Sequence, residues 1–156
     1  RIAIMEEGKI VQMGTGEEII SNPKTAVVKD FVAHFDQTKL LRAKAIMTVL
    51  AELKVNHKDS SVILDEVGTY RCVLDELGRP RRSVCGDREG RIIPWTLFQS
   101  GTFNQHDIVL GNEQLMIKDV IDVLGRTKRP MVIHDQAGKM IGAVTTDSLL
   151  HALSTK

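Results

Sequence analysis

Residues 130–153 contain Pro130-Met-Val-Ile-His134, Asp135-Gln-Ala-Gly138 and Met140-Ile-Gly-Ala-Val144, followed by the run from Thr146 to Leu153. The two apolar segments have the length of buried strands, and the Asp-to-Gly segment between them is typical of a tight turn. The last run begins with hydroxyl and carboxylate side chains, as helices often do. The stretch therefore predicts a strand, a turn, a second strand and a helix.

A similar order occurs earlier in the chain. A helix is expected over residues 115–126, and Ser61–Gly68 parallels its Lys118–Gly125 segment, while Tyr70–Leu74 parallels the first strand. Gly78 parallels Gly138 and Asp87 parallels Asp147 at the same interval. Two helix–strand–strand–helix copies spaced by roughly 60 residues indicate an internal repeat. Because neither small sheet can bury both faces alone, we expect the copies to pack together.

The first 35 residues predict a separate unit. Residues 1–14 have the pattern of a hairpin with its turn at Glu6–Lys9, and Thr15 with Glu18 forms a potential capping box. The short helix that follows is expected to stop at Asn22-Pro23. A second helix is predicted from Thr25 to Phe35, and residues 36–38 are interpreted as a boundary.

Composition excludes several classes of function. The 156 residues carry 21 Lys and Arg against 20 Asp and Glu, and only 4% are aromatic, which disfavours nucleic-acid binding. The run from Ala45 to Leu53 is about half the ~20 residues that cross a bilayer. No signal peptide is visible, and two cysteines favour a reducing cytosolic setting. The strand-like start without an upstream partner predicts a piece of a larger protein.

Catalytic and metal motifs are not found. Gly14-Thr15-Gly16 opens a helix and could cradle a phosphate, but the acidic Glu17 and Glu18 favour capping instead. No Walker A motif is present, the five histidines lack metal-ligand spacing, and neither cysteine has a nucleophile motif. We therefore expect no catalytic residue and no metal site.

Two segments remain open to two interpretations each. Five arginines between residues 79 and 91 could receive phosphates, or they could form a solvated loop balanced by nearby carboxylates. At Thr145–Ser148 a strand ends at hydroxyls and a helix begins with Asp147. This junction could bind a ribose and a phosphate, or it could simply cap the last helix.

The pattern Gly142-x-x-Thr145…Asp147 follows the strand, turn and strand predicted at residues 130–144. This arrangement resembles a cystathionine-β-synthase-type (CBS) domain, and two copies would form a Bateman module. Residues 1–20 with Asn22-Pro23 resemble the end of an ABC-transporter ATPase domain, and Val28–Val32, Asp36 and the run from Leu40 to Met47 resemble its join to a CBS pair. The combination is similar to ATP-binding subunits of glycine betaine/proline (quaternary amine) importers. It implies an α/β (α+β) fold, with an ATPase tail at 1–35, a first, degenerate CBS copy at 40–105 and a second at 106–156. Each copy is expected to be a small sheet with two helices.

The resemblance implies regulation by a ligand and no catalysis in this chain, because the ATPase motifs are absent. A regulatory nucleotide such as cyclic di-AMP, AMP or ATP would bind at Thr145, Asp147 and Ser148, bordered by Val109, Pro130 and Val132. The sequence departs from the pattern of nucleotide-binding CBS copies in two places. Ser148 occupies the place where many nucleotide-binding copies have Asp, with Asp147 one place early. In the first copy, Arg82 and Cys85 are aligned with the Gly and Thr.

The implied partners are a second copy of the chain, an upstream ATPase domain and a membrane permease. The implied location is the cytoplasmic face of the cell membrane. Two alternatives stay open. The CBS pair could be a structural dimerisation module without a ligand. It could also be an ionic-strength sensor in which the Arg79–Arg91 segment binds anionic lipid only at low salt.

Overall fold

The computed structural model describes residues 1–34 and 41–154. The chain divides into two compact units, Arg1–Leu41 and Arg42–Lys156, and each is described by itself. Phe35, the predicted boundary at residues 36–38 and Leu40 in the predicted join lie outside the described residues. Among the described helices, none is long and apolar enough to span a membrane.

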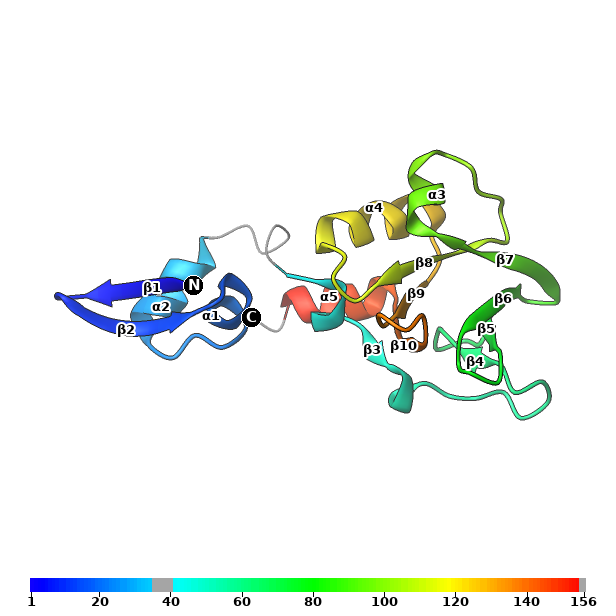
Figure 1. The fold of residues 1–156 in the computed structure, drawn as a ribbon, viewed down its shortest axis with the longest axis horizontal. Helices are drawn as coiled ribbons and strands as arrows, with labels where there is room; N and C mark the ends of the chain where they lie inside the picture. The colour runs from blue at the N-terminus through cyan, green and yellow to red at the C-terminus, as the bar shows by residue number, and fades with distance from the viewer. Residues whose placement is uncertain (35–40, 155–156) are drawn as a thin grey trace. The chain divides into compact units, whose positions relative to one another are not determined.

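The first unit is a β-hairpin followed by two short helices (Figure 1). Strands β1 (Ile2–Glu6) and β2 (Lys9–Gly14) pair antiparallel around a turn at Glu7 and Gly8, which both have positive φ. Helix α1 (Gly16–Ser21) begins with the predicted capping box and has Asn22 as its C-cap residue, and α2 is Ala26–Ala33. The hairpin, the box and the stop before Pro23 confirm the sequence-based expectations.

Gln12 connects the hairpin to the helices. Its side-chain amide donates to the carbonyl of Asn22 over 3.0 Å and accepts from the amide of Lys24 over 2.9 Å. Gln12 is buried opposite Ile4 on the inner face of the hairpin. Because both the NH₂ group and the oxygen of the Gln12 amide have hydrogen-bond partners, its burial leaves no polar atom of this amide unsatisfied. The two bonds fix the segment between α1 and α2 against the hairpin.

The second unit contains a curled sheet with the strand order β3-β10-β9-β8-β7-β6-β5-β4 among the described residues (Figure 1). Its strands are β3 (Thr48–Val49), β4 (Val62–Ile63), β5 (Tyr70–Leu74), β6 (Pro80–Cys85), β7 (Arg88–Pro94), β8 (Ile108–Asn112), β9 (Met131–His134) and β10 (Met140–Val144). Strands β7, β8 and β9 are parallel, and the other neighbours are antiparallel.

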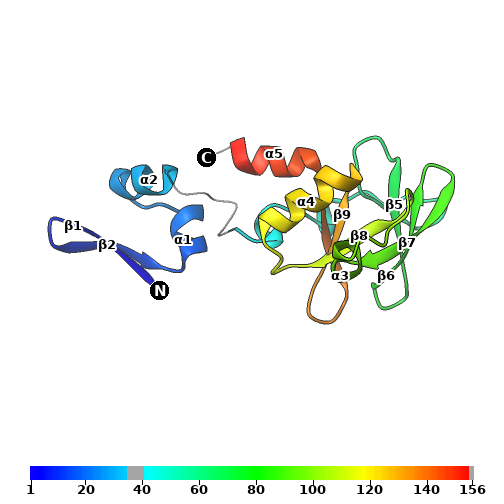
Figure 2. The same cartoon turned by 90° about the horizontal axis from the view of Figure 1, so that it is seen from above.

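The second half of this unit has the predicted element order. Helix α4 (Ile117–Thr127) joins β8 to β9, and helix α5 (Thr146–Ser154) follows β10. Figure 2 shows α4 along strands β8 and β9. The side chains of Val120, Val123 and Leu124 are buried on the sheet side of α4, which is the face that the helical periodicity predicts.

The helix predicted at Ser61–Gly68 is wrong. Val62 and Ile63 form strand β4 against β5, and a turn follows in which the Asp65 carboxylate accepts from the amides of Thr69 and Tyr70. Gly68 has φ +81°, a left-handed conformation that ends any helix. The short 3₁₀ turns η2 (Ala43–Ala45) and η3 (Leu50–Glu52) lie upstream. The hydrogen bonds to the Asp65 carboxylate favour a turn, and the β-branched side chains of Val62 and Ile63 favour a strand. These local preferences outweigh the helix that the repeat pattern predicts.

The predicted equivalence of Asp87 and Asp147 is also wrong. Asp87 lies in the tight turn between β6 and β7, next to Gly86 with φ +64°. The first half thus inserts an extra hairpin strand, and its helix α3 (Trp95–Gln99) begins only after Pro94. The junction that corresponds to Val144-Thr145 is Ile93-Pro94, so Arg82 and Cys85 do not stand at that junction.

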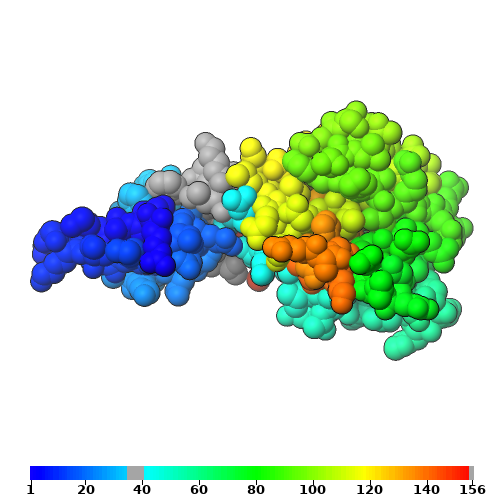
Figure 3. All heavy atoms as spheres, in the orientation of Figure 1, coloured from blue at the N-terminus to red at the C-terminus, as the bar shows by residue number. Residues whose placement is uncertain are grey.

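The glycine turns of the two halves are equivalent, as predicted. Asp75 and Asp135 each accept, through one carboxylate oxygen, two backbone amides in the turn that leads to Gly78 or Gly138. Both glycines have φ between +75° and +78°. The turns also touch, because the amide of Met140 donates to the carbonyl of Gly78 over 2.9 Å. Figure 3 shows the orange β9–β10 segment against the green segment around residue 80.

The core of the second unit draws on both halves. One cluster joins Val62, Leu64 and Cys72 of the first half to Ile108, Val132, Met140 and Ala143 of the second. On the helical side, the Arg126 guanidinium of α4 lies 4.4 Å from the ring centre of Phe98 in α3. The two halves therefore bury each other's apolar faces, which is what incomplete small sheets require.

Candidate functional site

The junction between β10 and α5 is a reciprocal hydroxyl cap. The amide of Ser148 donates to Thr145 Oγ1 and the amide of Thr145 donates to Ser148 Oγ, each over 3.0 Å, and the Ser148 hydroxyl donates to the Thr145 carbonyl over 3.1 Å. The capping interpretation is therefore correct. It leaves the Thr145 hydroxyl proton available as a donor, because Thr145 Oγ1 only accepts in this cap.

The other predicted site residues lie on or beside this junction in different ways. Asp147 is exposed on the first turn of α5. Val144 pairs with Met131 across β10 and β9, which places Thr145 opposite the buried Pro130. Val132 and Val109 lie further along β9 and β8 with buried side chains, so only their backbone could border a ligand. Thr145, Ser148 and Pro130 thus share one end of the sheet.

Three residues that the sequence interpretation did not assign to the site occupy the same end of the sheet. The buried Asp107 carboxylate accepts from the Arg91 guanidinium, with Nη2 to Oδ2 at 2.6 Å, and from the amides of Arg91 and Asn104. The guanidinium of Arg129 donates to the carbonyls of Asn104 and Asp107, over 3.0 and 2.7 Å. In the sequence, each of these three charged residues comes directly before an apolar segment, and this pattern could have indicated that they lie together at one end of the sheet.

Electrostatics at Asp107 follow from these contacts. Burial by itself would raise the pKa of Asp107, but the hydrogen bonds from Arg91 and the Asn104 amide outweigh burial and hold the pKa below the ordinary 3.8. The same pair raises the pKa of Arg91 above its ordinary value. Asp107 and Arg91 are therefore both charged at neutral pH.

The equivalent junction in the first half has a different chemistry. Pro94 is the N-cap residue of α3, and no side chain caps that helix. Proline offers neither a hydroxyl nor an amide proton, so the donors and acceptors of Thr145 and Ser148 have no counterpart there. Both junctions lead from a strand into a helix, but they differ in their polar groups.

Carboxylates contact part of the Arg79–Arg91 segment. Arg82 forms an ion pair with Glu89 across β6 and β7, and Arg91 pairs with Asp107. Arg79 and Arg81 contribute to the lowered pKa of Asp75, whose largest cause is the hydrogen bond from the Arg79 amide. These contacts favour the interpretation of the segment as a solvated, charge-balanced hairpin over that of a phosphate receptor.

Metal and thiol chemistry have little support. Within the described residues, no group of three or more His, Cys, Asp or Glu side chains could hold a metal ion. Burial raises the pKa of the Cys72 thiol to about 12, which keeps it protonated and unreactive at neutral pH. Cys85, at the end of β6, is partly exposed, and neither cysteine is in a disulfide.

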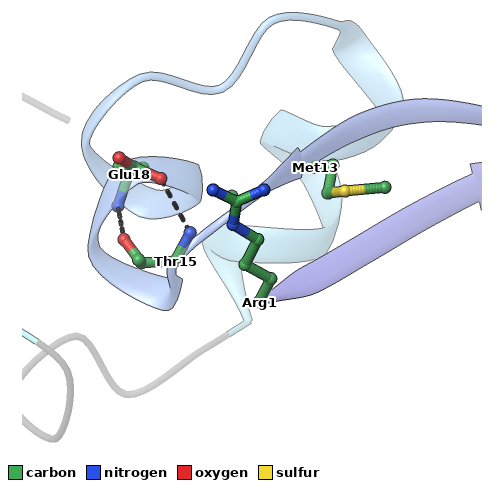
Figure 4. Close-up of a pocket in the computed structure, with 5 residues that line it drawn as sticks. Arg1, Met13, Thr15 and Glu18 are labelled. Carbon is green, nitrogen blue, oxygen red and sulfur yellow. Dashed lines mark hydrogen bonds between the residues drawn. The ribbon is translucent and has the colours of Figure 1, made fainter.

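A pocket of about 310 Å³ lies in the first unit, lined by Arg1, Met13, Gly14, Thr15 and Glu18. Figure 4 shows the reciprocal hydrogen bonds of Thr15 and Glu18 beside the side chain of Arg1. The Thr15 hydroxyl and the Glu18 carboxylate are both engaged in the capping box. The capping interpretation of Gly14-Thr15-Gly16 is therefore confirmed over that of a phosphate cradle.

Sequence relatives are ATP-binding proteins of transporters. The chain is 23% identical to the glycine betaine transport ATP-binding protein OpuAA of Bacillus subtilis, over 99% of this chain and 37% of that protein. It is 24% identical to the glycine betaine/carnitine transport ATP-binding protein GbuA of Listeria monocytogenes, over 98% and 39%. It is 31% identical to the methionine import ATP-binding protein MetN 1 of Staphylococcus aureus over 94 residues, which are 60% of this chain and 26% of that protein. The chain thus spans about two fifths of the length of the two betaine relatives.

Solved structures show the fold. No protein-family model matches the chain. The structure of CBSX2 in complex with AMP superposes with a TM-score of 0.50 at 16% identity, covering 73% of this chain and 96% of that one. The CBS domain of a bacterial CNNM/CorC family Mg²⁺ transporter gives 0.50 at 14% identity, covering 77% and 79%. The chain is therefore similar over nearly all of its length to ATP-binding subunits of glycine betaine ABC transporters, and its fold is similar to that of CBS domain proteins over 73% and 77% of the chain.

Proposed function

We propose that this chain is the regulatory CBS module of the ATP-binding subunit of an osmoprotectant importer, of the glycine betaine/proline type. The observation that carries the proposal is a combination in one chain. Similarity to two betaine transport ATP-binding proteins extends over 98% and 99% of the chain, and similarity in fold to CBS domain proteins extends over 73% and 77% of it. Such a module acts on ATP hydrolysis by another domain and performs no chemistry itself.

The ligand of the module is an adenine nucleotide, cyclic di-AMP, AMP or ATP, bound at the junction between β10 and α5. The first turn of α5 presents amide groups to an anion, Thr145 has a hydroxyl proton to donate, and the exposed Asp147 can accept from ribose hydroxyls. The Ser148 amide holds the Thr145 side chain by donating to its Oγ1, and the backbone at Val109, Pro130 and Val132 borders the same end of the sheet. The AMP complex of the similar CBSX2 fold supports this class of ligand.

Regulation requires a ligand that binds one arrangement of the modules better than another. The nucleotide would shift a pair of ATP-binding subunits between two states by its difference in affinity, and by reciprocity the state of the pair would alter nucleotide affinity. The proposed partners are a second copy of the chain, the ATPase domain and a membrane permease. The proposed location is therefore the cytoplasmic face of the membrane.

Isothermal titration of the chain with cyclic di-AMP, AMP and ATP tests the ligand. We expect saturable micromolar binding of one of the three, lost in Thr145→Ala and retained in Thr145→Ser, which keeps the hydroxyl. The matched control is Thr25→Ala, because Thr25 caps α2 in the first unit through the same kind of bond to Val28. The absence of heat with all three nucleotides, well above micromolar concentration, would exclude the nucleotide proposal.

The first unit is proposed to be the tail of the ATPase domain. The outer face of its hairpin exposes Met5, Ile10 and Met13, an apolar surface that further residues of a longer protein would cover. Peroxide oxidation followed by mass spectrometry tests the proposal. Met5 and Met13 should oxidise more slowly in the full-length transporter subunit than in this chain, with the half-buried Met116 of the second unit as the internal reference. Equal rates would contradict it.

A structural dimerisation module without a ligand is the second candidate. It is favoured by the uncapped Pro94 junction and by two exposed apolar side chains, Ile121 on α4 and Leu150 on α5. Sedimentation equilibrium would then give a dimer that Leu150→Glu converts to a monomer, with no nucleotide binding in either protein. A wild-type monomer would rule this candidate out.

Sensing of ionic strength is the remaining mode of regulation. It would need unpaired positive charge near Arg79–Arg91, and the ion pairs of Arg82 and Arg91 reduce that charge. Co-sedimentation with anionic vesicles distinguishes it from nucleotide sensing. Binding that disappears as the Debye length shortens from about 30 to 8 Å would support the salt sensor.

A further inference from the structure

A row of charged and hydroxyl side chains crosses one end of the curled sheet. Ile92 pairs with Ile108, so Arg91 lies beside Asp107 where β7 and β8 run parallel. Leu110 pairs with Val132, so Asp107 lies beside Arg129 where β8 and β9 run parallel. Val144 pairs with Met131, so the segment Arg129-Pro130 lies beside Thr145. The row therefore reads Arg91, Asp107, Arg129 and Thr145 from the first half into the second.

Direct contacts join the members of this row up to Arg129. The Arg91 guanidinium donates to both oxygens of Asp107, from Nε over 3.2 Å and from Nη2 over 2.6 Å. Nη1 of Arg129 donates to the Asp107 carbonyl over 2.7 Å and to the Asn104 carbonyl over 3.0 Å. The turn at residues 104–107 is thus held from one side by β7 and from the other by the residue that precedes Pro130.

Burial makes the Arg91 contact decisive for the turn. The Asp107 side chain is 3% exposed, whereas that of Arg91 is 55% exposed. A carboxylate this buried needs its partners, because an unpaired buried charge is strongly unfavourable. When Arg91 is removed, the Asp107 carboxylate is expected to turn toward water, and the 104–107 turn and the Arg129 guanidinium must move with it.

We propose that Arg91 is a positioning residue for the β10–α5 junction, acting through Asp107 and Arg129. The first half of the CBS pair thereby sets the nucleotide affinity of a site whose binding groups all lie in the second half. This inference rests on the proposed nucleotide site for its functional consequence. Its structural part, the control of the starts of β8 and β9 by Arg91, stands on the contacts alone.

The experiment compares Arg91→Gln with Arg82→Gln in the 156-residue chain. Arg82 is a matched control, because it lies directly opposite Arg91 on the neighbouring strand and its partner Glu89 belongs to the same hairpin. Titration well below the melting temperature should show nucleotide binding weakened about tenfold in Arg91→Gln, an ordinary size for coupling between sites. Arg82→Gln should bind as the wild type does. Arg91→Lys should recover only part of the affinity, because an ammonium group cannot donate as a fork to both Asp107 oxygens.

Hydrogen exchange separates the inference from the proposed function. Peptides covering residues 104–112 and 129–134 should exchange faster in Arg91→Gln than in Arg82→Gln, with or without nucleotide. If wild-type protein binds no nucleotide, the proposed function fails and this exchange result still decides the positioning role. Unchanged exchange in both peptides overturns the inference. A lowered melting temperature with unchanged affinity also overturns it, because that result indicates a purely structural ion pair.

Discussion

Asp107 is the one described side chain in this chain that combines a formal charge with nearly complete burial. Its carboxylate is tolerated because it accepts from the Arg91 guanidinium and from two backbone amides. Such a group stabilises the fold by an amount that depends on pH, since its proton affinity differs between the folded and unfolded chain.

The pH dependence of stability should therefore report on Asp107. Because the folded-state pKa lies below the unfolded value of 3.8, its stabilisation is fully present above pH ~4 and is lost as pH falls through the folded pKa. Urea unfolding at pH 6 should show Asp107→Asn less stable than wild type by about 1–3 kcal/mol. This difference should shrink below pH ~4. If the difference in unfolding free energy between the two proteins stayed constant down to pH 2, ionisation of Asp107 would not be its cause.

Gly90 permits the close approach that places Asp107. A Cβ at Gly90 would lie 1.9 Å from the His106 carbonyl and 2.6 Å from Ser83 Oγ, so Gly90→Ala must displace the neighbouring backbone. We expect a loss of about 1–3 kcal/mol in unfolding free energy. Gly125→Ala is the control, because its Cβ meets nothing within 4 Å inside α4 and should stabilise the helix by about 0.5–1 kcal/mol. Equal effects of the two substitutions in chemical denaturation would refute the steric explanation.

At the scale of elements, the two Asp-to-Gly turns are the most faithful part of the repeat. Asp75 and Asp135 accept two turn amides each, and both turns end in glycine with positive φ. The elements that follow these turns differ: in the first half β6 continues into an extra hairpin strand, whereas in the second half β10 leads straight into α5.

The equivalence of the turns predicts equal responses to substitution. Gly78→Ala and Gly138→Ala should each cost about 1 kcal/mol, because open space surrounds both Cβ positions and only the left-handed backbone is strained. Asparagine at either position should cost less, since it tolerates this conformation better. Guanidinium unfolding of the four variants measures these costs. A much larger loss at Gly78 than at Gly138 would show that the carbonyl contact of Gly78 with Met140 is distorted as well.

At the scale of the whole chain, the two halves of the second unit share one core. Residues of β4 and β5 pack against residues of β8, β9 and β10 in a single apolar cluster. The ion pair of Arg91 and Asp107 and the contact of Arg126 with Phe98 also cross between the halves.

Because of this shared core, the second half should not fold alone. A fragment of residues 105–156 loses the apolar partners Val62, Leu64 and Cys72. Circular dichroism and proton NMR should show reduced helix content and poor chemical-shift dispersion for the fragment. Mixing with residues 42–104 should restore both signals. A well-dispersed spectrum of the fragment alone would mean that the second half is an independent domain.

The features that depend on neighbouring residues could be predicted from the amino-acid sequence alone. The capping box at Thr15 and Glu18, the stop before Pro23, the hairpin of residues 1–14 and the elements from α4 to α5 were all predictable, because caps, turns and periodicity act over a few residues. The resemblance to CBS domains and to betaine transport ATP-binding subunits could also be stated from the sequence.

The features that depend on contacts between distant segments became visible in the folded chain. In place of the helix expected at Ser61–Gly68, Val62 and Ile63 form a strand because β5 offers them a partner, and a turn follows. The first-half junction proved to be Pro94 because an extra hairpin strand precedes it. The pairing of Asp107 with Arg91 and Arg129 was equally out of reach, since parallel strands bring together residues that no local pattern connects. Burial and strand register are properties of the assembled sheet, and they determine which polar groups meet at its edge.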